Sequence, residues 1–218
     1  DLADAVQRHH EAAGISFVIG PGVRAFAGED RVTHVVLDDG QQLAADVVVE
    51  AVGSQPTTGW LHGNGLDLSD GVLVDNRLAM VGAARAVAVG DVARFPNPLF
   101  DDVPRRVEHQ NVPTETGRHA GRSLAHYLRS GAYPHPAPPF TPMPSFWSDQ
   151  AELRLQAFGL PGLADRTEVL AGGFDADDPG VVVGYLRGDR LVGVVALGVA
   201  GGTDMVTTAA ALRRRIGT

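Results

Sequence analysis

The chain has 218 residues, 44% of them hydrophobic and 20% charged, which is enough for one or two ordinary hydrophobic cores. Its formal net charge of −8 argues against nucleic acid as a partner, because proteins bind DNA and RNA through an excess of lysine and arginine. Cysteine is absent, so disulfides and thiolate metal sites are excluded within these residues, and we expect a cytoplasmic protein.

No apolar run reaches the roughly 20 residues that a helix needs to span a bilayer, and no signal-peptide pattern occurs, so we expect no membrane association. The eight histidines follow no metal-ligand spacing, and no metal site is predicted. The sequence starts at Asp1 without an initiator Met, and its first residues read as the interior of a helix. We therefore expect the chain to be part of a longer protein.

Residues 1–54 combine one helical pattern with several strand patterns. Apolar residues recur at helical spacing from Leu2 to Ala13, and Gly14 is expected to end this helix. The continuous apolar run 46–53 predicts a buried strand of a parallel sheet that is covered on both faces. Shorter strands are predicted at 15–19, 22–27, 32–37 and 41–43, and hairpin turns at 28–30 and 38–40.

Residues 20–25 match the G-x-G-x-x-A pattern of dinucleotide-binding loops. That pattern binds a pyrophosphate only where a helix follows, because the amides of the helix N-terminus hold the phosphates. A β-hairpin is predicted to follow here, so we do not interpret these residues as a phosphate site.

The middle of the chain contains a candidate ligand site. Strands are predicted at 71–75 and 86–89, and the second runs directly into Gly90 and Asp91. A carboxylate at the carboxyl end of a parallel sheet lies where open α/β folds bind ligands, and it can accept hydrogen bonds from sugar hydroxyls. An ordinary turn capped by an aspartate explains the same residues equally well, so both interpretations stay open at this point.

A long helix and a proline-rich segment follow. The helix is predicted over 113–129, with Pro113 in its first turn and Glu115 near its positive end. Six prolines between Tyr133 and Pro144 rule out a helix or a central strand and predict an extended linker. Beyond it, strands are predicted at 154–159, 166–172, 181–187 and 190–197, a tight turn at Gly188-Asp189 and a last helix at 204–216.

Two adjacent aromatic residues, Phe146 and Trp147, come directly after the linker and are followed by Ser148 and Asp149. Such a pair packs either against a planar cofactor or into a core between domains. The residues alone favour the core.

Five segments, taken together, resemble those of one enzyme superfamily. Residues 87–93 (VAVGDVA) resemble the second FAD motif of flavoprotein reductases with two dinucleotide-binding domains, and 94–98 continue it. Residues 106–114 (RVEHQNVPT) resemble the segment that enters the helix pointing at the flavin. Residues 146–150 (FWSDQ) resemble the opening of the small C-terminal domain in ferredoxin reductases of the putidaredoxin reductase type, and 51–57 resemble the exit from the NAD domain. The chain thus resembles the C-terminal portion of an FAD-dependent pyridine nucleotide-disulfide oxidoreductase.

This resemblance implies an α/β fold that forms part of a two-dinucleotide-binding-domain flavoprotein, with a small α+β domain at its C-terminal end. Residues 1–54 would be the trailing half of the NAD(P)-binding domain. Residues 55–140 would be the second FAD segment, and residues 141–218 the C-terminal reductase domain.

The resemblance also implies which residues meet the flavin. Asp91, which follows Gly90, would bind the ribityl chain. Backbone near Gln110 would meet the isoalloxazine ring, although many relatives carry tryptophan or valine at this position. Trp147 would lie near the flavin or on the route to the iron–sulfur partner. No residue is expected to act as a general acid or base, because the flavin carries the chemistry.

The implied function is electron transfer from NAD(P)H through FAD to a ferredoxin-type [2Fe-2S] protein, of the kind that supplies Rieske oxygenases and cytochromes P450. Both phosphate-binding G-x-G-x-x-G loops of the family are missing from these 218 residues. We therefore expect the chain alone to be a truncated, inactive piece that binds FAD weakly or not at all.

Two other functions are weighed against this one. Residues 141–218 are a candidate docking or dimerisation module without catalytic activity. A disulfide reductase would carry a His-Pro signature in its C-terminal dimerisation domain, whereas His135-Pro136 lies in the proline-rich linker and argues against that assignment.

Overall fold

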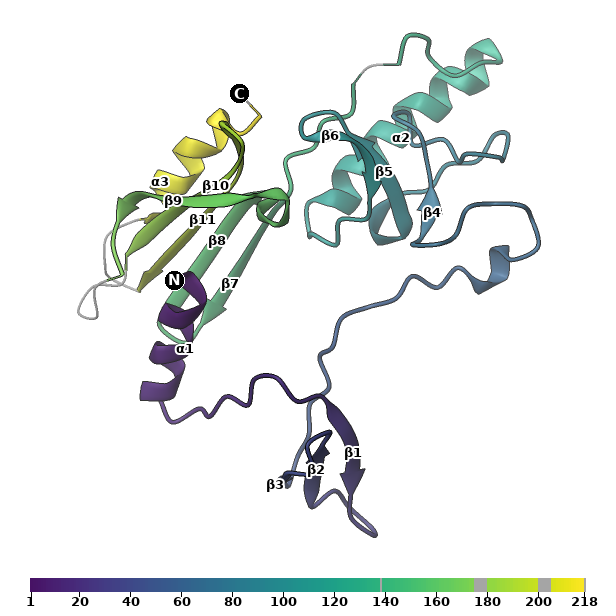
Figure 1. Cartoon of the computed structure of the whole chain (residues 1–218). Helices are drawn as coiled ribbons and strands as arrows, with labels where there is room; N and C mark the ends of the chain where they lie inside the picture. Colours follow the sequence, from purple (N-terminus) through teal and green to yellow (C-terminus); the bar gives the residue numbers. More distant parts are fainter. Residues whose placement is uncertain (138, 175–179, 200–204, 218) are drawn as a thin grey trace. The chain divides into compact units, whose positions relative to one another are not determined.

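The computed structural model describes residues 1–137, 139–174, 180–199 and 205–217, and the chain divides into two compact units. The first unit is Asp1–Gln55 and the second is Pro56–Thr218. Both units mix helices with strands (Figure 1). The finer division of the chain at residues 54 and 140 stays a prediction.

The first unit contains one helix and one small antiparallel sheet. Helix α1, Leu2–Ala12, begins at a capping box in which the side chains of Asp1 and Asp4 each accept a hydrogen bond from the backbone of the other. The chain leaves the helix through Gly14, whose φ of 88° favours glycine. The sheet has the order β1-β2-β3, and its strands are β1 Val23–Ala27, β2 His34–Leu37 and β3 Gln42–Ala44.

These elements confirm the helix and the three hairpin strands predicted for this unit. They also confirm that a strand, β1, follows the G-x-G-x-x-A match at 20–25. No helix begins there to hold a pyrophosphate.

Two strands predicted in the first unit are wrong. Residues 15–19 and 46–53 form no strand, and Ile19 and Val49 are 75% and 84% exposed. A buried parallel strand needs a neighbour on each side to satisfy its backbone amides and carbonyls. Among the described residues of this unit, the only sheet is β1-β2-β3, and neither segment pairs with it. Part of the second segment, 48–52, lines a groove with β1 instead.

The second unit begins with a three-stranded sheet and a long helix. The strands are β4 Val72–Leu73, β5 Ala93–Asn97 and β6 Asp101–Arg105; β4 runs parallel to β5, and β6 runs antiparallel to it. Helix α2, Val112–Ser130, has a proline in its first turn and ends at Gly131, which adopts the left-handed conformation. This confirms the helix predicted over 113–129.

The strand predicted over 86–89 is wrong. In this segment only Val87 forms a bridge, with Ala79, and the carbonyl of Ala86 accepts a hydrogen bond from the amide of Met80. The segment therefore folds back onto residues just before it instead of joining a parallel sheet. The apolar residues of this segment are explained by partial burial, since Ala88 is buried in the same core as residues of β5.

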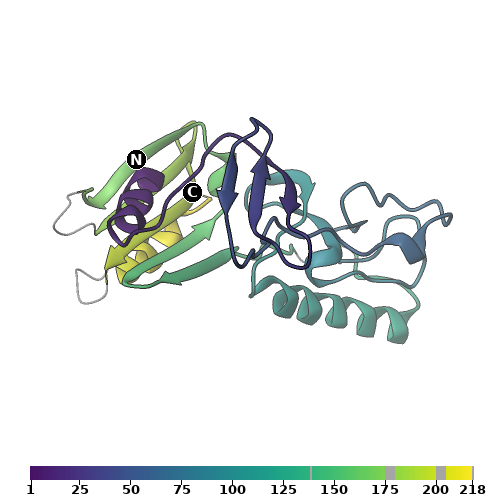
Figure 2. The ribbon, with the colours of Figure 1, turned by 90° about the horizontal axis from the view of Figure 1, so that it is seen from below.

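A five-stranded antiparallel sheet of order β7-β8-β11-β10-β9 follows the proline-rich segment. Helix α3, Met205–Leu212, packs on one face of this sheet through Met205 and Ala209 (Figure 2). It confirms a last helix, but the α-helix ends at Leu212, before the predicted 216, and Arg213–Arg215 form a 3-10 turn. Residue 204 lies outside the described residues. The strands are β7 Ser145–Gln150, β8 Leu153–Gly159, β9 Arg166–Gly172, β10 Val181–Arg187 and β11 Arg190–Val199. Four of them were predicted, and β7 was missed.

The proline-rich segment 133–144 forms neither helix nor strand in its described residues, as predicted. It is nevertheless packed against the rest of the unit. Phe140 and Pro144 are buried, and the carbonyl of Pro142 accepts a hydrogen bond of 2.9 Å from Asn97 Nδ2. The segment therefore connects the two sheets of the unit and is packed against them through its buried residues.

The tip of the β5–β6 hairpin enters the core of the five-stranded sheet. Phe100 is only 2% exposed and belongs to the same apolar cluster as the residues beneath α3. The carbonyl of Phe100 accepts hydrogen bonds from Arg187 and Arg190, and that of Leu99 accepts one of 2.7 Å from Arg190. Arg187 also pairs with Asp101 at 2.9 Å. The two sheets of the unit are joined at this point.

The Asp101 carboxylate gives this junction a pH dependence. A hydrogen bond from Arg105, helped by one from Arg187, holds the pKa of Asp101 well below its usual range, although burial opposes the shift. A carboxyl group with a lowered folded-state pKa stabilises the fold above its unfolded pKa of about 3.9, and this contribution is lost as the pH falls through the folded pKa.

Asp101→Asn is therefore expected to lower the free energy of unfolding near neutral pH by about 1 kcal/mol, since solvent screens this partly exposed group. The variant should also lose less stability than the parent on acidification below about pH 4. Urea unfolding across this pH range measures both effects. If the free energies of unfolding of the two proteins fell equally on acidification, the pH dependence would not come from Asp101.

The described part of the chain has neither a membrane-spanning helix nor a cluster of metal ligands. None of its helices has the length and apolarity to cross a membrane. None of its histidine, aspartate and glutamate side chains gather in threes or more in a way that could hold a metal ion.

Candidate functional site

Gly90 lies directly against the first turns of α2. It opens the short 3-10 turn Gly90–Val92 with a φ of 71°, a conformation that favours glycine. Its amide donates a hydrogen bond of 3.0 Å to Oγ1 of Thr116, whose hydroxyl in turn donates to the carbonyl of Val112 at 2.7 Å. A Cβ at position 90 would lie in ordinary contact with Pro113. The turn is thus fixed to the start of the helix.

Thr116 is completely buried, so its hydroxyl is the group that satisfies the Gly90 amide. Thr116→Val keeps the shape of the side chain but leaves that buried amide unpaired, which is expected to cost about 1–3 kcal/mol of stability. Thr116→Ser keeps the hydroxyl and should cost less than half as much. Chemical denaturation of the two variants makes the comparison, and equal losses would show that the hydroxyl is unimportant.

The carboxylate of Asp91 is exposed beside this turn, while its backbone is held in place. The Asp91 carbonyl accepts a hydrogen bond of 2.9 Å from Arg106 Nη1. Arg106 also pairs with Asp70 at 2.6 Å and with Glu108. The hydrogen bond to Asp70 is the main reason that the pKa of Arg106 is raised. Arg106 therefore connects the Asp91 turn to the segment that leads into α2.

The start of α2 presents a helix N-terminus without a side-chain cap. Asn111 occupies the N-cap position but donates its amide hydrogens to Glu115 Oε1 at 2.9 Å and to the carbonyl of Met143 at 3.0 Å. Gln110, just before it, is exposed. The helix dipole favours negative charge at this end.

Strand β7 reaches the same region through Phe146. The Phe146 ring packs on the ring of His109, with 5.3 Å between the ring centroids, and burial lowers the pKa of His109. Trp147 is 50% exposed, and because neighbouring side chains of a strand alternate between faces, it points to the opposite side of the sheet from Phe146.

The structure therefore brings Gly90 and Asp91 together with the segment that contains Gln110, at the start of α2. Trp147 belongs to the strand that touches this segment, but the neighbouring Phe146 makes the contact. The sequence did not single out Thr116, Arg106 or His109 for these roles. The buried face of α2 offers a signal for Thr116, since Val112, Thr116, Ala120 and Ser123 recur at helical spacing. Arg106 and His109 lie in the segment 106–114 that carries the resemblance, but nothing in the sequence indicates the contacts that they make.

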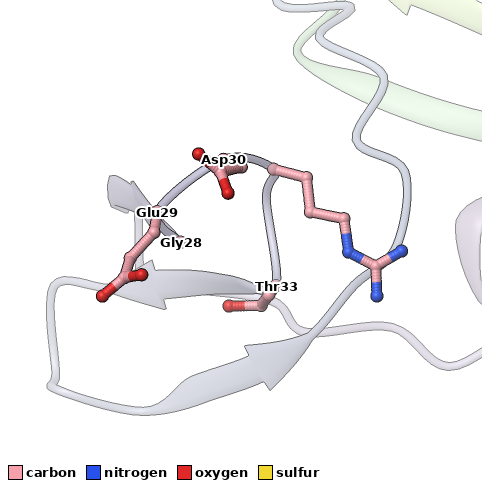
Figure 3. Close-up of a pocket in the computed structure, with 5 residues that line it drawn as sticks. Gly28, Glu29, Asp30 and Thr33 are labelled. Carbon is pink, nitrogen blue, oxygen red and sulfur yellow. The ribbon is translucent and has the colours of Figure 1, made fainter.

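A separate hollow lies in the first unit, at the turn between β1 and β2. Gly28, Glu29, Asp30, Arg31 and Thr33 line it (Figure 3). It is shallow, and its two carboxylates and one guanidinium come from a single hairpin turn, which is the usual composition of a solvated loop. We assign it no function.

Comparisons with known proteins place the chain in a family. Residues 1–117 match the family described as pyridine nucleotide-disulphide oxidoreductase, and residues 145–217 match the one described as reductase C-terminal. The chain belongs to the pyridine nucleotide-disulphide oxidoreductase family. The resemblance to ferredoxin reductases predicted from the sequence is confirmed as well.

Two curated relatives are reductases by name. The chain is 33% identical over 195 residues to the probable ferredoxin reductase CtmF of Castellaniella defragrans, and 31% identical over 188 residues to the putidaredoxin reductase CamA of Pseudomonas putida. These matches cover 88% and 85% of the chain and 41% of each relative. The chain thus spans about two fifths of the length of these relatives.

Solved structures of the family show the same fold. The ferredoxin reductase for the CYP199A2 system from Rhodopseudomonas palustris superimposes with a TM-score of 0.78 at 30% identity, covering 90% of this chain and 45% of that one. Putidaredoxin reductase in its covalent complex with putidaredoxin gives a TM-score of 0.79 at 27% identity, covering 98% and 48%. The α/β fold predicted from the sequence, a partial two-dinucleotide-binding-domain flavoprotein, is confirmed.

The family implies FAD, and the residues at the start of α2 fit one end of that cofactor. An exposed carboxylate on a rigid turn suits the hydroxyls of a ribityl chain, and an uncapped helix N-terminus suits a ring that gains negative charge. The same residues do not fit the diphosphate, which needs a glycine-rich loop leading into a helix.

Proposed function

We propose that this chain supplies part of the flavin site of an NAD(P)H-dependent reductase that passes electrons to a ferredoxin-type [2Fe-2S] protein. The observation that carries the proposal is the fixed Gly90–Asp91 turn on an uncapped N-terminus of α2, within a chain of the reductase family. The names of CtmF and CamA support the ferredoxin-type partner, since both are reductases of such carriers by name.

Each residue has a role in this proposal that follows from its surroundings. When bound, FAD accepts a hydride from NAD(P)H and releases single electrons to the iron–sulfur partner. Asp91 accepts hydrogen bonds from the ribityl hydroxyls, and Gly90 allows the backbone to approach them closely. The positive end of α2, next to Gln110, stabilises negative charge on the ring. Trp147 is half exposed on β7, which leaves its ring free to face the partner protein in this proposal.

We propose further that the 218 residues alone bind FAD weakly and do not turn over. The match to a dinucleotide loop at 20–25 leads into β1, so no diphosphate site forms there. The cofactor would have to be held by its ribityl and ring end only. A cytoplasmic location is part of the same proposal, on the ground that a chain without cysteine suits a reducing compartment.

The test is a chimera in which this chain replaces the matching 195 residues of CtmF. We expect the purified chimera to contain FAD in stoichiometric amount and to reduce a ferredoxin with NADH or NADPH. The chain alone should remain colourless after incubation with FAD and gel filtration. Two results contradict the proposal: a folded chimera without flavin, or a flavin-loaded chimera that does not reduce ferredoxin.

A further inference from the structure

Leu160, which follows β8, packs against both apolar cores of the second unit. Among the described residues, the parts that hold the three-stranded and the five-stranded sheets also meet at two polar junctions. One is the tip of the β5–β6 hairpin, and the other is the start of α2. The candidate flavin site includes the second place but not the first, so the first has no role in the function proposed above.

At the hairpin tip, two arginines bind main-chain carbonyls of the other sheet. Arg187 and Arg190 form the cross-strand pair that closes the β10–β11 hairpin. Together they donate hydrogen bonds to the carbonyls of Leu99 and Phe100, and Arg187 also pairs with the carboxylate of Asp101. A bidentate guanidinium fixes both distance and direction, which a purely apolar contact does not.

The same tip carries an apolar anchor. The Phe100 side chain is buried in the apolar cluster that also contains Phe158 and Leu191 of the five-stranded sheet and Ile216 near the end of the chain. The buried ring and the oriented hydrogen bonds can all be satisfied in only one arrangement of the two sheets. The hairpin tip therefore fixes the position of the five-stranded sheet relative to the three-stranded sheet.

At the second place, the start of α2 contacts the chain at the beginning of β7 through a hydrogen bond and a ring contact. Asn111 donates to the carbonyl of Met143, and His109 packs on Phe146. These contacts position β7 at the start of α2 through Phe146, while Trp147 lies on the opposite face of the same strand. They lack the ion pair and the buried anchor that the hairpin tip has.

We propose that the hairpin tip, Leu99–Asp101 held by Arg187 and Arg190, is a latch that sets the position of β7 at the start of α2. Asp101 and Arg187 are then positioning residues for electron transfer, although they take no part in the flavin site. The role of the latch in electron transfer rests on the proposed function. The coupling between the two places, which is the effect of the hairpin tip on the position of β7 at the start of α2, does not depend on that function.

The coupling is tested in the chain itself, without flavin, by NMR of His109. The Phe146 ring shifts the resonance of the His109 ring protons, and a His109→Gln variant assigns that signal among the eight histidines. In Asp101→Asn and in Arg187→Gln, we expect the signal to move toward that of a free histidine and its apparent pKa to rise toward about 6.5. The double variant should shift it no further than Arg187→Gln alone, because Arg187→Gln already breaks the pair with Asp101 as well as the hydrogen bond to Phe100.

Asp102→Asn is the matched control, since it removes the same charge from the next, exposed residue of β6 and should leave the signal unchanged. If Asp101→Asn does not fold, Arg187→Lys keeps a positive charge but loses the second hydrogen bond and should give a smaller shift of the same sign. An unchanged His109 signal in the folded Asp101 and Arg187 variants overturns the latch.

The role in electron transfer is tested in the CtmF chimera. Asp101→Asn should lower the rate of ferredoxin reduction by about 10-fold, because displacements of about 1 Å can cost up to about 100-fold. Reduction of ferricyanide, which needs no docked protein, should be unaffected. Equal losses with both acceptors, or none with either, contradict this role. A chimera without flavin would contradict the proposed function and leave the NMR result to decide the coupling.

Discussion

Phe100→Ala is expected to lower the free energy of unfolding of the second unit by about 3–5 kcal/mol, the usual cost of removing a buried phenylalanine. Phe100 is 2% exposed at the tip of the β5–β6 hairpin and packs into the core beneath α3. The variant loses the ring and leaves a cavity that can close only if the surrounding elements move together, which the hydrogen bonds of Arg187 and Arg190 to the hairpin tip oppose. Urea unfolding followed by circular dichroism measures the loss.

Val103→Ala on the same hairpin is the control, because Val103 is largely exposed and its truncation should change stability by no more than about 0.5 kcal/mol. Phe100→Leu should lose less than Phe100→Ala, since leucine refills part of the cavity. A loss below about 1 kcal/mol in Phe100→Ala would mean that the tip is not an anchor.

Asp91→Ala in the CtmF chimera is expected to weaken FAD binding by about 10- to 100-fold, because a hydrogen bond to a charged group contributes about 1.5–3 kcal/mol. The carboxylate is exposed and its backbone is fixed by Arg106, so the substitution removes an interaction with the ligand without disturbing the turn. Fluorescence titration of the apo-chimera with FAD measures the dissociation constant.

Asp102→Ala carries the same change to an exposed carboxylate on β6 and should leave FAD affinity unchanged. Asp91→Asn keeps an acceptor oxygen but not the charge, and its affinity for FAD should lie between those of the parent and the alanine variant. FAD affinity that is unaltered in Asp91→Ala would remove Asp91 from the proposed site.

The C-terminal sheet was predictable because its signals are local. Strands β10 and β11 are apolar runs on either side of Gly188-Asp189, so the turn sets the register without help from distant residues. Helix α2 was predictable for the same reason, since a proline in its first turn and a glycine after its end mark both boundaries. Strand β7 has no such signal, and it exists because β8 pairs with it.

The predictions of strands at 46–53 and 86–89 are wrong because an apolar run indicates that a segment can be buried. It does not indicate which strand, if any, the segment pairs with. Residues 46–53 have no strand beside them in the described unit, and Val87 pairs with Ala79 in a local fold-back. Strand pairing depends on the whole sheet, and the composition and periodicity of one segment carry no information about it.

The candidate site was partly predictable. The motif around Gly90 and Asp91 and the entry to α2 could be found by resemblance, and the structure places them in contact through Thr116 and Arg106. The latch could not be found, because Asp101 and Arg187 are 86 residues apart and each looks like an ordinary surface charge in the sequence. Only the fold brings them together.

The central claim is that the Asp91 turn, the backbone at Gln110 and the β7 edge surround one flavin ring. A crystal structure of the FAD-loaded CtmF chimera tests it most directly. We predict the Asp91 carboxylate within hydrogen-bonding distance of a ribityl hydroxyl, the isoalloxazine ring at the start of α2, and Trp147 at the edge facing solvent. A ring bound away from the N-terminus of α2, with Asp91 in contact only with water, would contradict the account.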